Sequence, residues 1–278
     1  MNGYRPPVFG GLPPVVKNLL IINVILLIAT WALKSIGIDL TRVLALFYVE
    51  SEYFSPYQYI THMFMHGGFA HLFFNMFALW MFGRVLESVW GSKKFLLYYF
   101  VTGLGAAALH TFVNWINLSS LQESATAFLN TPSVDQFMIF IQEYFPDVDR
   151  YFKNFNYIEF INQWEAHPEN THFIETAQQV VRDLVTFKIN IPTVGASGAV
   201  FGVLLAFGML FPNTQLMLLF PPIPIKAKYF VIGYGLIELY AGVMQQPGDN
   251  IAHFAHLGGM LFGFILIKYW NSQRSNFY

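Results

Sequence analysis

The stretch A-H-L-G-G-M-L-F-G, residues 255–263, places an ionisable ring among small residues in an apolar segment. Ala252, His256, Gly259 and Gly263 follow one another at i, i+4, i+7 and i+11, so they share one face of a helix. Small residues on one face let a second helix backbone approach closely. The stretch therefore predicts a tightly packed helix pair with an imidazole at the contact.

A second stretch, G-A-S-G at residues 195–198, offers a matching surface. Ser197 is surrounded by residues with almost no side chain, so another backbone or a substrate can reach its hydroxyl. Gly198 and Gly202 also have the small-xxx-small spacing that serves helix packing alone. If this face packs on the stripe around His256, the imidazole can take the serine proton as a general base. A serine without such a base is a weak nucleophile.

The composition places the chain in the membrane class. Of its 278 residues, 55% are hydrophobic and 11% are charged, whereas a soluble domain carries about 25% charged residues. The chain has no cysteine, which excludes disulfides, thiolate metal sites and cysteine nucleophiles. The net charge is −1 and no basic run is present, so we expect no nucleic-acid partner.

Six apolar segments are each long enough to cross a bilayer, which takes about 20 residues. They are predicted at residues 17–35, 57–82, 94–115, 191–211, 227–244 and 250–270. The stretch 36–56 is too polar to cross and is predicted to be an interfacial loop with a short helix. We therefore predict an all-α polytopic membrane protein built as a six-transmembrane-helix bundle.

The stretch 117–190 interrupts this apolar rhythm, because it is polar and holds more acidic than basic residues. We predict an extracytoplasmic insertion between the third and fourth spans, with helices near 137–144 and 173–185. The chain is accordingly divided into an N-terminal part of the membrane core at 1–116, the insertion, and a C-terminal part of the core at 191–278.

Lysine and arginine gather on one side of the predicted spans, which is the cytoplasmic side by the positive-inside rule. The segments on that side hold Arg5, Lys17, Arg84, Lys93, Lys94, Lys226, Lys228, Lys268 and Arg274. We therefore expect a multi-pass protein of the plasma (cell inner) membrane with both termini in the cytoplasm.

Histidines are concentrated where ionisable groups are costly, which marks a functional site. Five of the eight lie in the predicted second and sixth spans, namely His62, His66, His71, His253 and His256. His71 and Asn75 are four residues apart and share one helix face. Two donors aimed at one point can stabilise an oxyanion, but they can equally clamp neighbouring helices together.

Taken together, these pieces resemble the rhomboid family of intramembrane serine proteases. The matching motifs are H-G-G-F-A-H-L-F-F-N at 66–75, G-x-x-x-E at 83–87, G-A-S-G at 195–198 and A-H-L-G-G-M-L-F-G at 255–263. The resemblance implies that Ser197 is the nucleophile and His256 the general base, in a dyad without a third carboxylate. One departure is the stretch 57–59, Tyr-Gln-Tyr, which stands where many members have Trp-Arg.

The resemblance also implies supporting roles for other residues. His71, Asn75 and the backbone N–H of Ser197 correspond to the oxyanion hole. Gly195 lets the loop turn into the fourth helix, and Phe201 stacks on the catalytic histidine. His62, His66 and His253 are expected to line a polar cavity that admits water. Glu238, near the outer end of the fifth span, is expected to have an interfacial structural role.

The implied function is that of an intramembrane serine endopeptidase that cleaves peptide bonds in or near transmembrane segments of other membrane proteins. Its expected partners are transmembrane protein substrates and the lipid bilayer, and no cofactor or metal is expected. One alternative is a non-proteolytic rhomboid-like protein that binds membrane helices. A haem or metal protein that uses His62, His66, His71 or His253 as ligands is a second alternative, and a transporter is a third.

Overall fold

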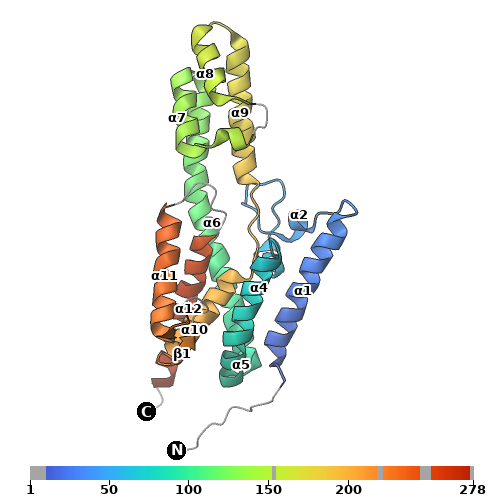
Figure 1. The fold of residues 1–278 in the computed structure, drawn as a ribbon, viewed down its shortest axis with the longest axis vertical. Helices are drawn as coiled ribbons and strands as arrows, with labels where there is room; N and C mark the ends of the chain where they lie inside the picture. The colour runs from blue at the N-terminus through green and yellow to red at the C-terminus, as the bar shows by residue number, and fades with distance from the viewer. Residues whose placement is uncertain (1–10, 152–154, 218–221, 245–251, 276–278) are drawn as a thin grey trace, which may run out of the picture.

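The computed structural model describes residues 11–151, 155–217, 222–244 and 252–275 and is mostly helical (Figure 1). The main helices are α1 Pro14–Lys34, α2 Leu40–Leu44, α3 Gln58–Thr61, α4 Phe69–Ala78, α5 Arg84–Trp90, α6 Ser92–Asn130, α7 Val134–Tyr144, α8 Tyr157–Ala166, α9 Thr171–Ile189, α10 Ser197–Leu210, α11 Ala227–Met244 and α12 His253–Ser275. Short turns of other helix types are η1 His62–Phe64, the π-helical turn η2 Leu79–Gly83 and η3 Val148–Arg150. Two short antiparallel strands, β1 Gln215–Met217 and β2 Pro224–Lys226, precede α11, and Gln215 pairs with Lys226.

Helix α10 lies at the centre of the bundle, with α6 and α12 against it. Its sequence is apolar all round, and ten of its fourteen residues are buried. A Cβ added at Gly198 would overlap the Cβ of Ala106 on α6, and one added at Gly259 on α12 would overlap the carbonyl oxygen of Gly198. The predicted close packing of the fourth and sixth apolar helices is therefore present.

The small residues of α12 pack against two helices, α10 and α6, rather than against α10 alone. Gly259 faces α10, but a Cβ at Gly263 would overlap the phenol oxygen of Tyr98 on α6. That buried phenol donates a hydrogen bond of 2.8 Å to the carbonyl oxygen of Gly202. Tyr98 thus ties α6 to α10 in the space that Gly263 leaves free.

The second span differs from the single helix predicted at 57–82. The chain forms α3 and η1, is non-helical from Met65 to Gly68, and then runs as one helical segment, Phe69–Trp90, through α4, η2 and α5. Gly67 and Gly68 explain the break, because each glycine disfavours a helix interior by about 1 kcal/mol relative to alanine. His62 and His66 consequently precede the spanning helix.

Two other predicted helix ends are also shifted. The fourth span begins at Ser197 instead of residue 191, because residues 191–196 are non-helical and Thr193 forms a bridge with Leu46. The third span does not end near residue 115: α6 continues to Asn130, so the predicted boundary between 116 and 117 falls inside a helix. Arg5 and Asn250, used above for orientation and for the start of the sixth span, lie outside the described residues.

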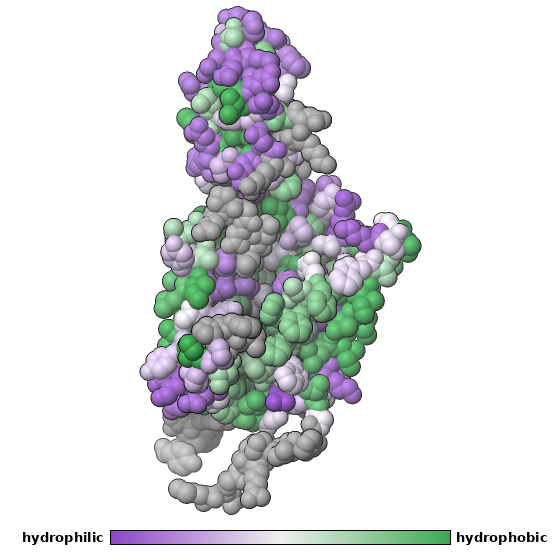
Figure 2. Space-filling view, viewed as in Figure 1, coloured by the Kyte–Doolittle hydropathy of each residue, from purple (hydrophilic) through white to green (hydrophobic). Residues whose placement is uncertain are grey.

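Within the part of the chain that the structure describes, three helical segments are long and apolar enough to cross a membrane, namely Pro14–Lys34, Phe69–Trp90 and Ser92–Asn130. Helix α10 is a shorter apolar helix. On α1, Ile21, Ile25 and Ile28 are all exposed, which suits a lipid-facing surface. Figure 2 shows hydrophobic residues over the body of the bundle and hydrophilic residues over the far end of the extension. The count of six spans stays a prediction.

The extension is a packed helical unit with its own hydrophobic cluster. The far half of α6 lies with α7, α8 and α9 (Figure 1), and these helices bury Phe128, Phe137, Phe140, Trp164 and Val181, among others. Its helices start where side chains can cap them: Ser133, Asn156 and Asn170 each accept a hydrogen bond from a backbone N–H in the first turn. The helices predicted near 137–144 and 173–185 correspond to α7 and α9.

Helix α1 begins with a proline, and a side chain of α5, which is distant in the sequence, caps its N-terminus. The buried carboxylate of Glu87 on α5 accepts hydrogen bonds from the backbone N–H groups of Val15 (2.9 Å) and Val16 (2.8 Å) and from the hydroxyl of Ser92 (2.7 Å). These N–H groups have no partner within their own helix, and a negative charge is favourable at this helix end. The G-x-x-x-E motif thus has a structural role here.

Candidate active site

The loop before α10 presents Ser197 at the first turn of the helix. Gly195 has φ +128°, a conformation that residues with a side chain rarely adopt. Its backbone N–H donates to the carbonyl oxygen of His62 at 3.0 Å, which holds the loop against η1. Ala196 makes no side-chain cap, so the first N–H groups of α10 have no cap at the helix start. The predicted turn at Gly195 is present.

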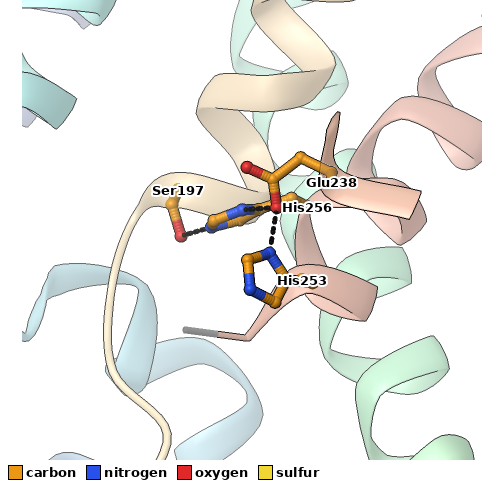
Figure 3. A network of polar contacts seen from close by, with 4 residues as sticks. All are labelled: Ser197, Glu238, His253 and His256. Atoms are coloured by element: carbon orange, nitrogen blue, oxygen red, sulfur yellow. Dashed lines mark hydrogen bonds and ion pairs between the residues drawn. The ribbon is translucent and has the colours of Figure 1, made fainter. Parts of the chain in front are cut away.

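Ser197 and His256 are in hydrogen-bond contact although 59 residues separate them. Nε2 of His256 lies 2.9 Å from Oγ of Ser197 (Figure 3). The close approach of Gly259 to Gly198 brings α12 near enough for this contact. The pair thus has the geometry of a nucleophile and a general base.

The ring of His256 is held by an aromatic partner. Phe201 stacks on it with ring centroids 4.2 Å apart and an angle of 7° between the rings. Tyr234 of α11 lies in turn 5.7 Å from Phe201, centroid to centroid. The stacking expected for Phe201 is observed.

His71 borders the same space as the serine hydroxyl. A Cβ added at Gly195 would lie 2.9 Å from Nε2 of His71 and 3.5 Å from Oγ of Ser197. The backbone N–H of Gly67 donates a long hydrogen bond of 3.4 Å to Nδ1 of His71. Nε2 then carries the ring hydrogen in the neutral side chain and is available as a donor beside Ser197.

Asn75 stands one turn further along α4, on the same face as His71. Its side chain is buried, and its Nδ2 has no hydrogen-bond partner among the described residues. A buried donor without a partner is costly in free energy. Such a group suits a site where an acceptor arrives with the substrate.

The three histidines expected to line a water cavity lie in different surroundings. A cavity of about 10 Å³ beside Ser197 is lined by His62, whose Nδ1 lies 2.8 Å from the carbonyl oxygen of Gln58. His66 is not among the lining residues and packs edge-on against His71, with centroids 5.0 Å apart. His253 is not among them either, because it faces Glu238.

A second histidine at the cavity was missed in the sequence. His110 of α6 lines it, and its Nε2 lies 2.8 Å from Oγ1 of Thr193 and 3.2 Å from Nδ2 of Asn114. Its position inside the apolar third span was a usable signal, because ionisable groups at that depth are rare. His110 thus ties α6 to the loop that leads to Ser197.

Glu238 occupies a different position from the interfacial one expected. Its side chain is buried, and Oε2 lies 2.8 Å from Nδ1 of His256 and 2.6 Å from Nδ1 of His253 (Figure 3). A carboxylate therefore stands behind the histidine, on the side opposite Ser197. The expectation that Glu238 is an interfacial residue is wrong, because its side chain is buried against two imidazoles.

The donor atoms of Glu238, His253 and His256 all lie within 4.8 Å of one another, as metal ligands would. Tetrahedral ligands about 2.0–2.2 Å from zinc lie about 3.3–3.6 Å from one another. Here the carboxylate oxygen lies 2.6 Å and 2.8 Å from the two ring nitrogens. These lengths suit hydrogen bonds among the three side chains better than shared coordination of an ion.

Two relatives are similar to this chain. An uncharacterized mitochondrial rhomboid protein of Schizosaccharomyces pombe is 25% identical over 220 residues, which cover 77% of this chain and 51% of that protein. The rhomboid protease GluP of Bacillus subtilis is 44% identical over 45 residues, 16% of this chain and 9% of its own length. The chain thus spans about half the length of the first relative and a small part of the second.

The model of the Rhomboid domain matches residues 53–119 and 171–272, which is more than half of the chain. The part between the two matches, residues 120–170, holds the end of α6 together with α7 and α8, whereas α9 lies within the second match. The matched part includes Ser197 and His256 together with His71 and Asn75. The chain belongs to the rhomboid family.

Proposed function

We propose that this protein is a serine-type intramembrane endopeptidase that cleaves peptide bonds in or near transmembrane segments of other membrane proteins. The observation that carries the proposal is the 2.9 Å contact between Oγ of Ser197 and Nε2 of His256. Family membership supports the same reaction class. A serine hydroxyl held against an unprotonated imidazole nitrogen is the activated nucleophile that acyl transfer requires.

In the proposed reaction, Oγ of Ser197 bonds to the scissile carbonyl carbon while its proton passes to Nε2 of His256. The carbonyl oxygen becomes an oxyanion, which accepts hydrogen bonds from His71, Asn75 and the backbone N–H of Ser197. The C–N bond then breaks, and the leaving nitrogen takes the proton from His256. A water molecule then attacks the acyl-enzyme and gives a proton to His256. His256 returns that proton to Oγ of Ser197 as the ester bond breaks.

The proposed substrates are transmembrane helices that unwind locally. An intact helix keeps its peptide groups in internal hydrogen bonds, so a scissile bond in a membrane segment must first be freed. Glycine or other helix-weakening residues near the cleaved bond lower the free energy of that unwinding. We infer that the substrate enters beside α11, whose exposed residues include Leu236, Ile237 and Tyr240.

The proposal is tested by incubating the purified protein in liposomes with a reporter transmembrane substrate. Wild-type protein should cleave the reporter, whereas Ser197→Ala and His256→Ala should each lower kcat by at least about 1000-fold, as in other serine proteases. Their thermal unfolding should stay close to that of the wild type. Wild-type cleavage by either folded variant would contradict the proposed site.

A further inference from the structure

Among the described residues, the carboxylate of Glu238 makes two polar contacts, and both go to imidazole nitrogens at the candidate site. We propose that Glu238 is a positioning residue that extends the pair to a triad, Ser197–His256–Glu238, with His253 as the second anchor of the carboxylate. This inference rests on the proposed function, because it assigns a role in the same reaction.

The contacts determine which nitrogen of His256 is free to act as a base. An ionised carboxylate only accepts hydrogen bonds, so Nδ1 of His256 carries the ring hydrogen that faces Oε2. Nε2 is then unprotonated in the neutral ring and faces the Ser197 hydroxyl at 2.9 Å. A single hydrogen on Oε2 could serve only one of its two imidazole neighbours, whereas an ionised carboxylate satisfies both. The arrangement therefore selects the tautomer that a general base needs.

The position of Glu238 on α11 is an inward-facing one. The buried residues of this helix are Ala227, Val231, Glu238 and Gly242, which at i, i+4, i+11 and i+15 share one face. The other faces of α11 expose large apolar side chains. A buried carboxylate is costly unless charged or polar partners compensate it. In the described residues those partners are His256 and His253, so the polar contacts of the carboxylate all lie at this site.

Gly242 allows the start of α12 to approach the carboxylate. A Cβ added at Gly242 would lie 3.2 Å from Cβ of His253 and 3.3 Å from Cε2 of Phe254. This close approach brings His253, one turn before His256 on α12, to 2.6 Å from Oε2. His253 thereby holds the carboxylate in place, and the carboxylate in turn orients His256.

The carboxylate also helps the reaction electrostatically. When Nε2 takes the serine proton, His256 becomes an imidazolium ion between Ser197 and Glu238. A negative charge at 2.8 Å stabilises that cation in a site with little water, where such interactions are strong. The effect exists only after proton transfer, so it raises kcat rather than substrate affinity.

The test uses the full chain in liposomes with the reporter substrate. Glu238→Gln keeps the shape of the side chain, but its amide can donate to Nδ1 of His256 and favour the wrong tautomer. We expect kcat to fall by about 100- to 10,000-fold, with KM within about twofold of the wild type. Glu238→Asp keeps the charge with a shorter reach, so its kcat should lie between those of the Gln variant and the wild type.

Two controls separate positioning from stability. Glu87→Gln makes the same change at a buried carboxylate far from the site in sequence; it should lower thermal stability while the folded protein keeps wild-type kcat. In the His256→Ala background, Glu238→Gln should cause no further loss, because residues that act through one another are non-additive. His253→Asn, which keeps a donor near the Nδ1 position, should lower kcat less than Glu238→Gln does.

The outcomes distinguish this inference from the proposed function. If Ser197→Ala is inactive but Glu238→Gln and Glu238→Asp both keep wild-type kcat, the triad is wrong and the protease assignment stands. If Ser197→Ala remains active, the proposed function itself fails. Loss of wild-type activity with a metal chelator, restored by zinc, would overturn the triad in favour of a metal site at the same three residues. If Glu238→Gln does not fold, the test uses the kcat values of Glu238→Asp and His253→Asn. Wild-type kcat in both variants would overturn the triad.

Discussion

Gly259 of α12 lies directly against the carbonyl oxygen of Gly198 on α10, so closely that a Cβ at Gly259 would overlap that oxygen. Gly198 is the residue after Ser197, and Gly259 is three residues after His256. The contact therefore sets the distance between the side chains of the proposed catalytic pair as well as the packing of the helices. If the proposed reaction is correct, this helix contact is also required for activity.

The first prediction concerns this contact. Gly259→Ala should push α12 away from α10 and lower kcat by at least about 100-fold, because misplacement by about 1 Å costs that much. The control is Gly233→Ala on α11, where a Cβ would meet no atom within 4 Å. It should keep activity and gain up to about 1 kcal/mol in helix stability. Reporter cleavage and thermal unfolding of both variants provide the comparison. Full activity of Gly259→Ala would contradict the prediction, because it would show that the reaction does not depend on this close contact between α10 and α12.

The second prediction concerns the oxyanion donors. Asn75→Ala should lower kcat by about 100- to 1000-fold, because one donor to the oxyanion is lost while others remain. The loss should be smaller than that of Ser197→Ala. Labelling of Ser197 by a fluorophosphonate would show whether the nucleophile is still formed. A double variant that replaces both His71 and Asn75 by alanine and still cleaves at the wild-type rate would remove these residues from the mechanism.

The third prediction concerns the cap on α1. Glu87→Gln replaces one carboxylate oxygen by an amide that cannot accept from Val15 or Val16. An N–H group at the helix start then loses its partner, and we expect a loss of about 1–3 kcal/mol in stability. Thermal unfolding in detergent measures the change. A variant as stable as the wild type would mean that water or lipid replaces the carboxylate at no cost.

The fourth prediction concerns orientation. The chain has no cysteine, so single cysteines report their own position without background labelling. Glu169→Cys, exposed in the extension, should react with a membrane-impermeant maleimide in intact cells. Lys93→Cys, on the side rich in lysine and arginine, should react only after permeabilisation. The opposite labelling pattern would place the termini outside the cytoplasm.

Helix ends show where the sequence pattern was an incomplete guide. An apolar segment predicts that a helix exists, but the glycines at 67 and 68 and the non-helical residues 191–196 shorten the second and fourth helices. The third helix runs on to Asn130, because its polar second half packs in the cluster of Phe128, Phe137 and Trp164. Hydropathy predicts which segments are apolar enough to cross a membrane. The helix ends depend on packing partners that are distant in the sequence.

From the sequence alone one could predict the membrane class, the small-residue faces of the helices at 197–210 and 253–275, and Ser197 and His256 as a candidate pair. These follow from composition and helical period, which are local properties of the chain. The position of Glu238 beside two imidazoles became visible only in the folded structure. A lone carboxylate in an apolar helix has the same local pattern whether it faces headgroups or an active site. The packing of α11 on α12, made close by Gly242, brings it within hydrogen-bond distance of two imidazoles.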